Sequence, residues 1–379
     1  MSKKLKEYNN FEDLNLNENL LRGIYSNGWE IPSYIQRVGI KPVLDGHDCI
    51  IQAQSGSGKT GTFSISILEK IKDLTKSCQC IILSPTREIA DQTKKVIDNI
   101  SQFMNIKIVG VIGGKKLDYE ESRKANIIVG TPGRVFHMIR INILNMDNVK
   151  LFILDEADQM FNIGFKDSII EIMEYIPVEA QIAIYSATMP VEILDIANQY
   201  MKNPVNILIK KNQLTLDGIK QFYIKADSEQ EKYDIMCELY QSLKINQSII
   251  YCLTKRKVEW LADKLEEEGF PVSKIHGGMN QEDRDEIMRK FRSGVNRILI
   301  TTDLLARGID VQSICLVINY DLPNNKQNYI HRIGRTGRYG KKGIAINLIL
   351  GSEMRKIKVL ENHYATQIEE MPENIQSFF

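Results

Sequence analysis

Short runs of consecutive valine, isoleucine and leucine residues alternate with longer helical stretches along the chain. Strands buried on both faces show such continuous apolar runs, whereas strands with one solvent-facing side alternate apolar and polar residues. We therefore predict parallel strands covered on both sides by helices. The first series of predicted strands is Cys49–Ala53, Cys80–Pro85, Ile106–Ile112, Ile127–Gly130, Leu151–Asp155, Ile182–Ser186 and Val205–Ile209.

The same rhythm restarts after a polar interruption that begins at Lys210. Two successive parallel-sheet domains are the simplest architecture for this repetition. We expect an N-terminal domain at 1–210, a short linker at 211–218 and a C-terminal domain at 219–379, tethered closely but free to rotate. The second series of predicted strands is Ile219–Ala226, Ser248–Leu253, Val272–His276, Arg297–Thr302, Leu316–Tyr320 and Gly343–Leu350.

The composition is that of a soluble protein, with 43% apolar and 26% charged residues among 379. No apolar run approaches the roughly 20 residues that span a bilayer, and no apolar segment follows the basic N-terminus as in a signal peptide. We expect a cytosolic or nuclear protein that does not bind membranes, with its six cysteines reduced. The net charge of +1 means that any nucleic-acid contact depends on local groups.

A phosphate-binding loop is predicted directly after the first strand and before a helix. Glycines allow backbone N–H groups to converge on phosphate oxygens at the start of a helix. Lys59 would hold the β- and γ-phosphates, and the Thr60 hydroxyl would ligate Mg²⁺. Ala53 stands where the usual pattern has a glycine. The residues expected at the phosphates are Ser55, Gly56, Ser57, Gly58, Lys59 and Thr60.

A group of acidic residues, Asp155-Glu156-Ala157-Asp158, follows the predicted strand that begins at Leu151. A parallel strand delivers such carboxylates to the carboxyl edge of its sheet. Asp155 is placed to bind Mg²⁺ through water, and Glu156 to orient an attacking water. An isolated acidic group would more often be a helix N-terminus, but the phosphate loop upstream favours a nucleotide site.

In these residues, and over nearly its full length, the chain resembles the DEAD-box RNA helicases. The stretch Gly28–Gln36 is similar to the family's Q motif, which reads adenine, with Phe11 as its upstream aromatic residue. The resemblance implies two tandem RecA-like domains, with ATP contacted by Phe11, Trp29 and Gln36. It also implies that loops of the first domain grip the RNA backbone without reading bases. The residues concerned are Pro85, Thr86, Arg87, Gly113, Gly114, Thr131, Pro132, Gly133 and Arg134.

The resemblance continues into motifs that link the two expected domains. Ser186 and Thr188 would couple ATP hydrolysis to strand separation through Asp158. In the second domain Gly277, Arg284 and Thr301 would contact RNA. Gly308 and Asp310 would contact the nucleotide, with Asp310 at the ribose. Two arginines can present planar guanidinium groups to a γ-phosphate, and the resemblance assigns this finger role to Arg335 and Arg338.

The resemblance implies an RNA-stimulated ATPase that uses ATP and Mg²⁺, closes on single-stranded RNA and unwinds duplexes locally, as a monomer. Within the family, the subfamily of initiation factor 4A is most similar. It implies action on mRNA 5′ regions in the cytoplasm with a scaffold of the initiation factor 4G type. The nuclear paralogue of the exon junction and ribosomal RNA processing is the alternative, as are an ATP-gated RNA clamp and a processive DNA translocase. The connection between Gly114 and Thr131 is short, Ile89 replaces a usual leucine and Leu253 a usual asparagine.

Overall fold

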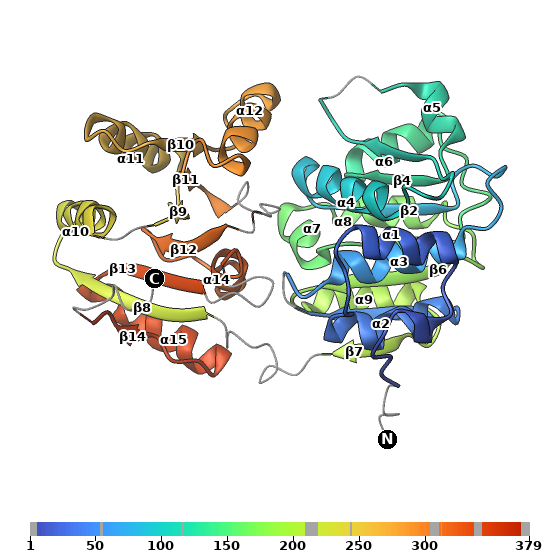
Figure 1. The fold of residues 1–379 in the computed structure, drawn as a ribbon, viewed down its shortest axis with the longest axis horizontal. Coiled ribbons are helices and arrows are strands. Elements are labelled where there is room, and N and C mark those ends of the chain that lie inside the picture. Colours follow the sequence, from blue (N-terminus) through green and yellow to red (C-terminus); the bar gives the residue numbers. More distant parts are fainter. Residues whose placement is uncertain are drawn as a thin grey trace. The chain divides into compact units, whose positions relative to one another are not determined.

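The chain forms two compact units, Met1–Ile209 and Lys210–Phe379, in a computed structural model (Figure 1). The predicted linker and the site residues Ser55, Gly308, Asp310 and Arg338 lie outside the described residues. The structure describes residues 6–53, 56–114, 117–208, 219–242, 245–303, 311, 313–336 and 343–372.

The first unit is built on a seven-stranded parallel sheet with the order β3-β4-β2-β5-β6-β1-β7. All seven predicted strands are present, most of them a residue or two shorter than expected. Four of the strands are buried along their whole length, which explains their continuous apolar sequences. The strands are β1 (Cys49–Gln52), β2 (Cys80–Leu83), β3 (Ile108–Val111), β4 (Ile127–Gly130), β5 (Leu151–Leu154), β6 (Gln181–Ser186) and β7 (Val205–Leu208).

Helices cover both faces of this sheet and enclose two separate hydrophobic clusters. On one face lie α1 (Glu18–Ser26), α2 (Tyr34–Leu44), α3 (Lys59–Lys70) and α4 (Arg87–Ile100). On the other lie α6 (Pro132–Arg140), α7 (Ala157–Ile163), α8 (Lys166–Met173) and α9 (Val191–Tyr200). A short helix, α5 (Tyr119–Lys124), precedes β4, and a 3₁₀ turn, Glu12–Leu14, precedes α1.

The second unit repeats the same succession of strands, in the order β10-β11-β9-β12-β13-β8-β14. Its six predicted strands are present, and the prediction of two parallel α/β domains is confirmed. The seventh strand was not predicted, because its two residues are glutamates that pair through the main chain with β8. The strands are β8 (Ile219–Ala226), β9 (Gln247–Tyr251), β10 (Val272–Ile275), β11 (Ile298–Thr301), β12 (Ile314–Asn319), β13 (Gly343–Leu350) and β14 (Glu369–Glu370).

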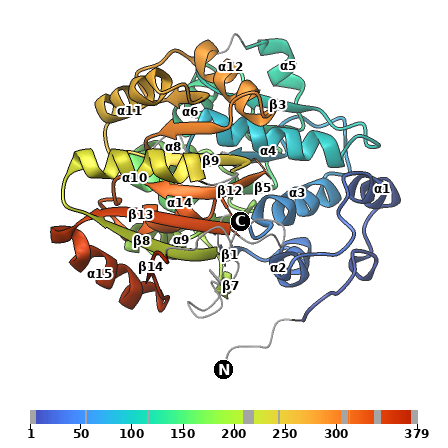
Figure 2. The ribbon, with the colours of Figure 1, turned by 60° about the vertical axis from the view of Figure 1, so that its left-hand side comes forward.

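Helices again cover both faces, and α10 and α15 lie on opposite sides of strands β8 and β13 (Figure 2). One face carries α10 (Glu229–Ser242) and α11 (Lys255–Glu267). The other carries α12 (Gln281–Arg292), α14 (Lys326–Ile333) and α15 (Met354–Tyr364), the last preceded by a 3₁₀ turn, Gly351–Glu353. None of the helices in the described part of the chain combines the length and the apolar character needed to cross a membrane.

Candidate nucleotide and RNA site

The predicted nucleotide residues of the first unit meet at the carboxyl edge of three neighbouring strands, β5, β6 and β1. In the sheet register Gln52 lies opposite Ser186, and Leu154 lies opposite Ile184. The backbone N–H of Ala53 donates to the carbonyl oxygen of Ser186 at 3.0 Å. The phosphate loop, the acidic group and the Ser186–Thr188 segment are therefore neighbours because parallel strands end at a common edge.

The described part of the phosphate loop is shaped by two glycines with positive φ angles, 83° at Gly56 and 101° at Gly58. Gly58 is the N-cap of α3, so the backbone N–H groups of the first helical turn are directed at the loop. Lys59 is only 4% exposed. Its Nζ donates to the carbonyl oxygen of Ala53 at 2.9 Å and so reaches back across the loop. Thr60, on the same helical turn, is half-buried.

Two adjacent carboxylates follow β5, and both are largely buried. Lys59 Nζ lies 3.2 Å from Glu156 Oε1. Burial, and after it the neighbouring Glu156 carboxylate, raises the pKa of Asp155, while Lys59 opposes this shift. Glu156 has the left-handed backbone angles φ 50° and ψ 49°, a conformation that costs a non-glycine residue about 1–3 kcal/mol. This left-handed conformation turns the chain sharply between β5 and α7, so that both carboxylates lie at one edge of the sheet.

The predicted coupling residues form a closed set of hydrogen bonds. Asp158 Oδ2 accepts from Thr188 Oγ1 at 2.7 Å and from Thr188 N at 3.2 Å. In return, the backbone N–H of Asp158 donates to Ser186 Oγ at 3.1 Å, and that hydroxyl donates to the carbonyl oxygen of Thr188 at 2.6 Å. The start of α7 is thus tied to the segment that leaves β6, so that a shift of either one moves the other.

The Q-motif residues pack directly against the first turns of α3. Gln36 is 6% exposed, and its Oε1 accepts from the backbone N–H of Ser33 at 2.8 Å. A Cβ atom at Gly61 would lie 2.4 Å from Gln36 Nε2 and 3.0 Å from two ring atoms of Trp29. Gln36 and Trp29 therefore meet the helix that carries Lys59. Phe11 is instead fully buried in the hydrophobic cluster of this face, where its ring contacts Tyr25 edge-on.

The predicted RNA residues of the first unit lie on the other half of the same edge, behind β3, β4 and β2. A Cβ atom at Gly113 would lie 3.1 Å from Arg87 Nη2, and one at Gly114 2.5 Å from Arg87 Nη1. The guanidinium group of Arg87 thus rests on the glycine turn after β3. Thr86 follows Pro85 and caps α4 by accepting from Ile89 N.

The loop after β4 opens α6, with Thr131 at the N-cap and Pro132 in the first turn. A Cβ atom added at Gly133 would meet none of the described residues within 4 Å, so the backbone there has open space beside it. Arg134 Nη1 lies 3.4 Å from His137 Nδ1. All predicted RNA residues of this unit therefore share one sheet edge with the nucleotide residues.

In the second unit, Gly277 follows β10 and is exposed, while Thr301 is the buried last residue of the neighbouring strand β11. Arg284 lies in the first turn of α12, as predicted, and its Nε donates to the carbonyl oxygen of Asn280. Arg335 follows α14, and its Nε donates to the carbonyl oxygen of His331 at 3.1 Å.

Several residues around these motifs were not predicted as site residues. Thr93 Oγ1 lies 3.5 Å from Asp155 Oδ2, and Gln159 Nε2 donates to Glu156 Oε2 at 3.2 Å. Arg332 forms a bidentate ion pair with Asp303, in which Nε donates to Oδ1 and Nη2 donates to Oδ2, the latter at 2.9 Å. Gln159 follows the acidic group by one residue, a spacing that could have indicated it. The pairs Thr93–Asp155 and Arg332–Asp303 join residues far apart in the sequence, and no local sequence pattern indicates them.

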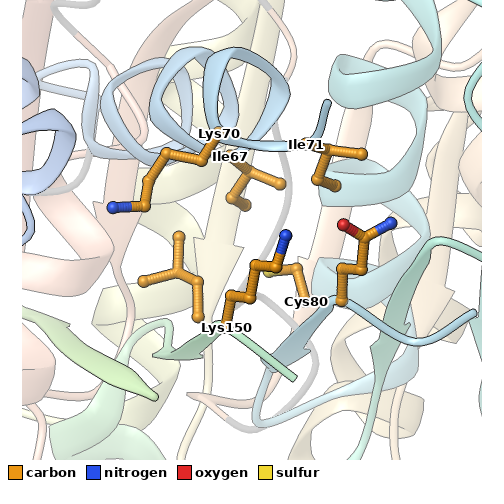
Figure 3. Close-up of a pocket in the computed structure, with 7 residues that line it drawn as sticks. Ile67, Lys70, Ile71, Cys80 and Lys150 are labelled. Carbon is orange, nitrogen blue, oxygen red and sulfur yellow. The ribbon is translucent and has the colours of Figure 1, made fainter. Parts of the chain in front are cut away.

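A small cavity of the first unit lies away from these motifs, between the end of α3 and the starts of β2 and β5 (Figure 3). Ile67, Lys70, Cys80 and Lys150 are among its lining residues. Its volume is about 10 Å³, room for a single water molecule at most. It lies at the amino ends of the strands, so it is not part of the site at their carboxyl ends.

Comparisons with known proteins give concordant matches. The family description "DEAD/DEAH box helicase" matches residues 33–196, and "Helicase conserved C-terminal domain" matches residues 231–340. The chain is 53% identical over 370 residues to the ATP-dependent RNA helicase eIF4A of Chaetomium globosum, covering 96% of this chain and 93% of that protein. It is 51% identical to eukaryotic initiation factor 4A of Caenorhabditis elegans, with 96% and 92% covered.

Among solved structures, Dbp5 of S. cerevisiae bound to RNA and ADP BeF3 is similar, with a TM-score of 0.89 and 34% identity. That match covers 97% of this chain and 96% of the Dbp5 chain. A DEAD box protein from Methanococcus jannaschii is 40% identical, with a TM-score of 0.59, 97% of this chain covered and 100% of that one.

Proposed function

Because the chain belongs to the DEAD/DEAH box helicase family, and within it to the relatives of initiation factor 4A, we propose that it is an ATP-dependent RNA helicase. One observation carries the proposal beyond the resemblance. The loops expected at the nucleotide and the loops expected at RNA occupy the two halves of a single sheet edge in the first unit. A ligand bound at one half of this edge can then affect the loops of the other half, because both halves belong to the same sheet.

Binding of ATP would begin with a change of partners at Lys59. Without nucleotide, its ammonium group is held by Glu156 and the carbonyl oxygen of Ala53. Phosphate oxygens of ATP carry more negative charge than this carbonyl and would compete for the ammonium group. Glu156, relieved of Lys59 but still bonded to Gln159, can then accept a hydrogen bond from the water that attacks the γ-phosphate. Gln36 and Trp29, packed on α3, would select adenine.

The residues also fit Mg²⁺. No group of three or more His, Cys, Asp or Glu side chains among the described residues could hold a metal ion alone. Mg²⁺ at nucleotide sites is commonly held by one or two carboxylates together with substrate phosphates and water. Burial raises the pKa of Asp155, and a bound cation would favour the ionised carboxylate over the protonated form. Thr60 and Asp155 would therefore hold Mg²⁺, which neutralises charge on the phosphates.

RNA would bind through its sugar–phosphate backbone. Thr301, also expected at RNA, is fully buried at the end of β11. The first unit offers Arg87, the Gly113–Gly114 turn and the start of α6, and the second unit offers Gly277 and Arg284. These are backbone amides and basic side chains, which grip phosphates but carry no base code. Hydrolysis would require Arg335 and Arg338 of the second unit at the γ-phosphate, so RNA that binds both units favours the state that hydrolyses ATP. Asp158 and Thr188 would pass this change to the RNA loops.

The high identity to initiation factor 4A supports a role on mRNA 5′ regions in the cytoplasm, as a monomer with a scaffold of the initiation factor 4G type. The nuclear paralogue would instead bind components of splicing or pre-ribosomal assemblies. An RNA clamp with little turnover is the second alternative, and the presence of both Glu156 and Arg335 disfavours it. Identification of proteins that co-purify with the tagged chain separates the first two roles.

ATP hydrolysis measured with RNA and with DNA of the same length tests the proposed activity. We expect RNA, and not DNA, to stimulate ATP hydrolysis. Lys59→Ala should abolish hydrolysis because the phosphates lose the ammonium group that binds them. The matched control is Lys70→Ala, at the opposite end of the same helix, which leaves RNA stimulation intact. Equal stimulation by DNA, or full activity of Lys59→Ala, would refute the proposal.

A further inference from the structure

Polar side chains lie side by side across the sheet of the second unit, and two of them are asparagines on neighbouring strands. In the sheet register Tyr251, Asn319, Asn347 and Tyr223 lie side by side on β9, β12, β13 and β8. Both asparagines are fully buried. Buried amides destabilise a fold unless they are hydrogen-bonded, so two at the centre of a sheet require a structural reason.

The two asparagines belong to an unbroken series of hydrogen bonds. Arg332 Nη1 donates to Asn319 Oδ1 at 3.0 Å, and Asn319 Nδ2 donates to Asn347 Oδ1 at 2.8 Å. Asn347 Nδ2 donates in turn to the carbonyl oxygen of Phe222 at 2.8 Å and lies 3.3 Å from the hydroxyl oxygen of Tyr329. Every polar atom of both side-chain amides therefore has a partner.

The series continues to the C-terminal part of the unit. The Tyr329 hydroxyl donates to Gln221 Oε1 at 2.9 Å, and Gln221 Nε2 donates to Thr366 Oγ1 at 2.9 Å. Tyr329 is fully buried, and Gln221 is 4% exposed. This series of hydrogen bonds thus runs from Arg332, across β12, β13 and β8, to the segment that follows α15.

The direction of these hydrogen bonds is fixed at both ends. The guanidinium group of Arg332 can only donate, and the carbonyl oxygen of Phe222 can only accept. Between them, each amide must turn its oxygen towards Arg332 and its nitrogen towards Phe222. Loss of Asn347 would leave Asn319 without its acceptor and free to rotate, which withdraws the oxygen that holds Arg332.

Arg332 links this series of hydrogen bonds to the elements that are expected to act in catalysis. All three nitrogen atoms of its guanidinium group donate hydrogen bonds. Nε and Nη2 donate to the carboxylate of Asp303, and Nη1 donates to the carbonyl oxygen of Asp321. Its guanidinium carbon lies 4.9 Å above the centre of the Tyr251 ring. Asp303 directly precedes 304–310, which contains Gly308 and Asp310, and Arg332 precedes Arg335 by less than one helical turn.

We propose that Asn319 and Asn347 are positioning residues for ATP hydrolysis, acting through Arg332. They set the guanidinium group against the sheet, and that group fixes both Asp303 and the end of α14. Neither asparagine touches the nucleotide in this scheme. The inference rests on the proposed function, because it assigns the two residues to the hydrolytic step of that same reaction.

The test is Asn347→Leu in the full chain, since leucine keeps the number and branching of the side-chain heavy atoms and removes every hydrogen bond. The RNA-stimulated kcat should fall at least about tenfold, while KM for ATP stays within about threefold. The matched control is Ile349→Ala, a fully buried change on the same face of β13. Ile349→Ala should lower the unfolding temperature but leave kcat unchanged at temperatures well below unfolding.

A double-mutant cycle with Arg335→Lys separates positioning from general loss of stability. If the asparagine acts through the end of α14, the double variant should lose no more kcat than Arg335→Lys alone. Multiplicative losses, or a normal kcat for Asn347→Leu, would overturn the inference. If Asn347→Leu does not fold, Asn347→Ala removes the same hydrogen bonds without adding atoms, and a kcat equal to wild type would then overturn it. Lack of RNA stimulation in the wild type would instead refute the proposed function.

Discussion

Replacement of Gly61 by alanine is the sharpest probe of the proposed adenine site. The added Cβ would lie 2.4 Å from Gln36 Nε2 and 3.0 Å from two atoms of the Trp29 ring. The amide would have to retreat by roughly 1 Å to reach ordinary van der Waals contact. Displacements of this size at positioning groups can cost about 10²-fold in rate. We expect kcat/KM for ATP to fall by between about 10-fold and 100-fold.

The effect on stability should be much smaller than the effect on activity, because two terms oppose each other. Alanine in place of glycine within a helix stabilises it by about 1 kcal/mol. Crowding of a packed interface costs about 1–3 kcal/mol. The net loss of about 0–2 kcal/mol lowers the unfolding temperature by no more than about 8 °C for a unit of this size.

The assay compares ATP and GTP as substrates in the presence of saturating RNA. Gly61→Ala should lose most of the preference for ATP, since the displaced Gln36 no longer matches the adenine edge. Gly39→Ala is the matched control, because its Cβ would crowd Thr62 Cγ2 at 3.0 Å in the same α2–α3 interface. It should lower stability and keep the preference. An unchanged ATP preference in Gly61→Ala would refute the assignment of Gln36.

Three further predictions concern the RNA loops, the coupling segment and the second unit. Gly114→Ala should weaken RNA binding about tenfold and reduce its salt dependence, because φ is 81° and the new Cβ lies 2.5 Å from Arg87 Nη1; salt titrations of affinity measure this. Thr188→Val removes the donor 2.7 Å from Asp158 Oδ2 and should cut strand displacement about tenfold with little loss of ATPase, as the ratio of the two rates would show. Arg335→Lys should lower single-turnover hydrolysis about 10³-fold while nucleotide affinity, measured by titration, stays nearly intact.

The sheets were predictable because burial on both faces leaves a direct signature in the sequence. Runs such as Leu151–Leu154 and Ile127–Gly130 are apolar throughout, and both became fully buried strands. β14 shows the limit of this signal. Glu369 and Glu370 are exposed, and only main-chain pairing with Phe222 and Tyr223 makes them a strand.

The candidate site was predictable wherever its residues end a strand. Asp155 and Ser186 follow or end neighbouring parallel strands, and such ends meet at one edge whatever the details of the fold. The pairing of Lys59 with Glu156 needed the structure, because it depends on the left-handed turn at Glu156. Phe11 illustrates the opposite case. The resemblance assigns it to the nucleotide, whereas the structure shows it fully buried in the core, so its role stays a prediction.

The two units share a strand order but differ in charge at equivalent places, which explains why the phosphates are expected in the first. After β1 the chain has glycines and Lys59, whereas after β8 it has Asp227, Ser228 and Glu229. Lys232, in the first turns of α10, is 1% exposed and already lies 3.4 Å from Glu353 Oε2.

The carboxylate that follows the central strand shows the same contrast. In the first unit this place holds Asp155 and Glu156, and Glu156 pairs with Lys59 of the phosphate loop. In the second unit it holds Asp321, whose Oδ1 lies 2.8 Å from Lys257 Nζ and whose Oδ2 accepts from the backbone N–H of Leu253. Lys257 also bonds Glu229, 3.0 Å away. Since ATP would have to break these ion pairs without gaining a glycine loop, we expect the second unit to contribute arginines to the reaction rather than to hold the phosphates.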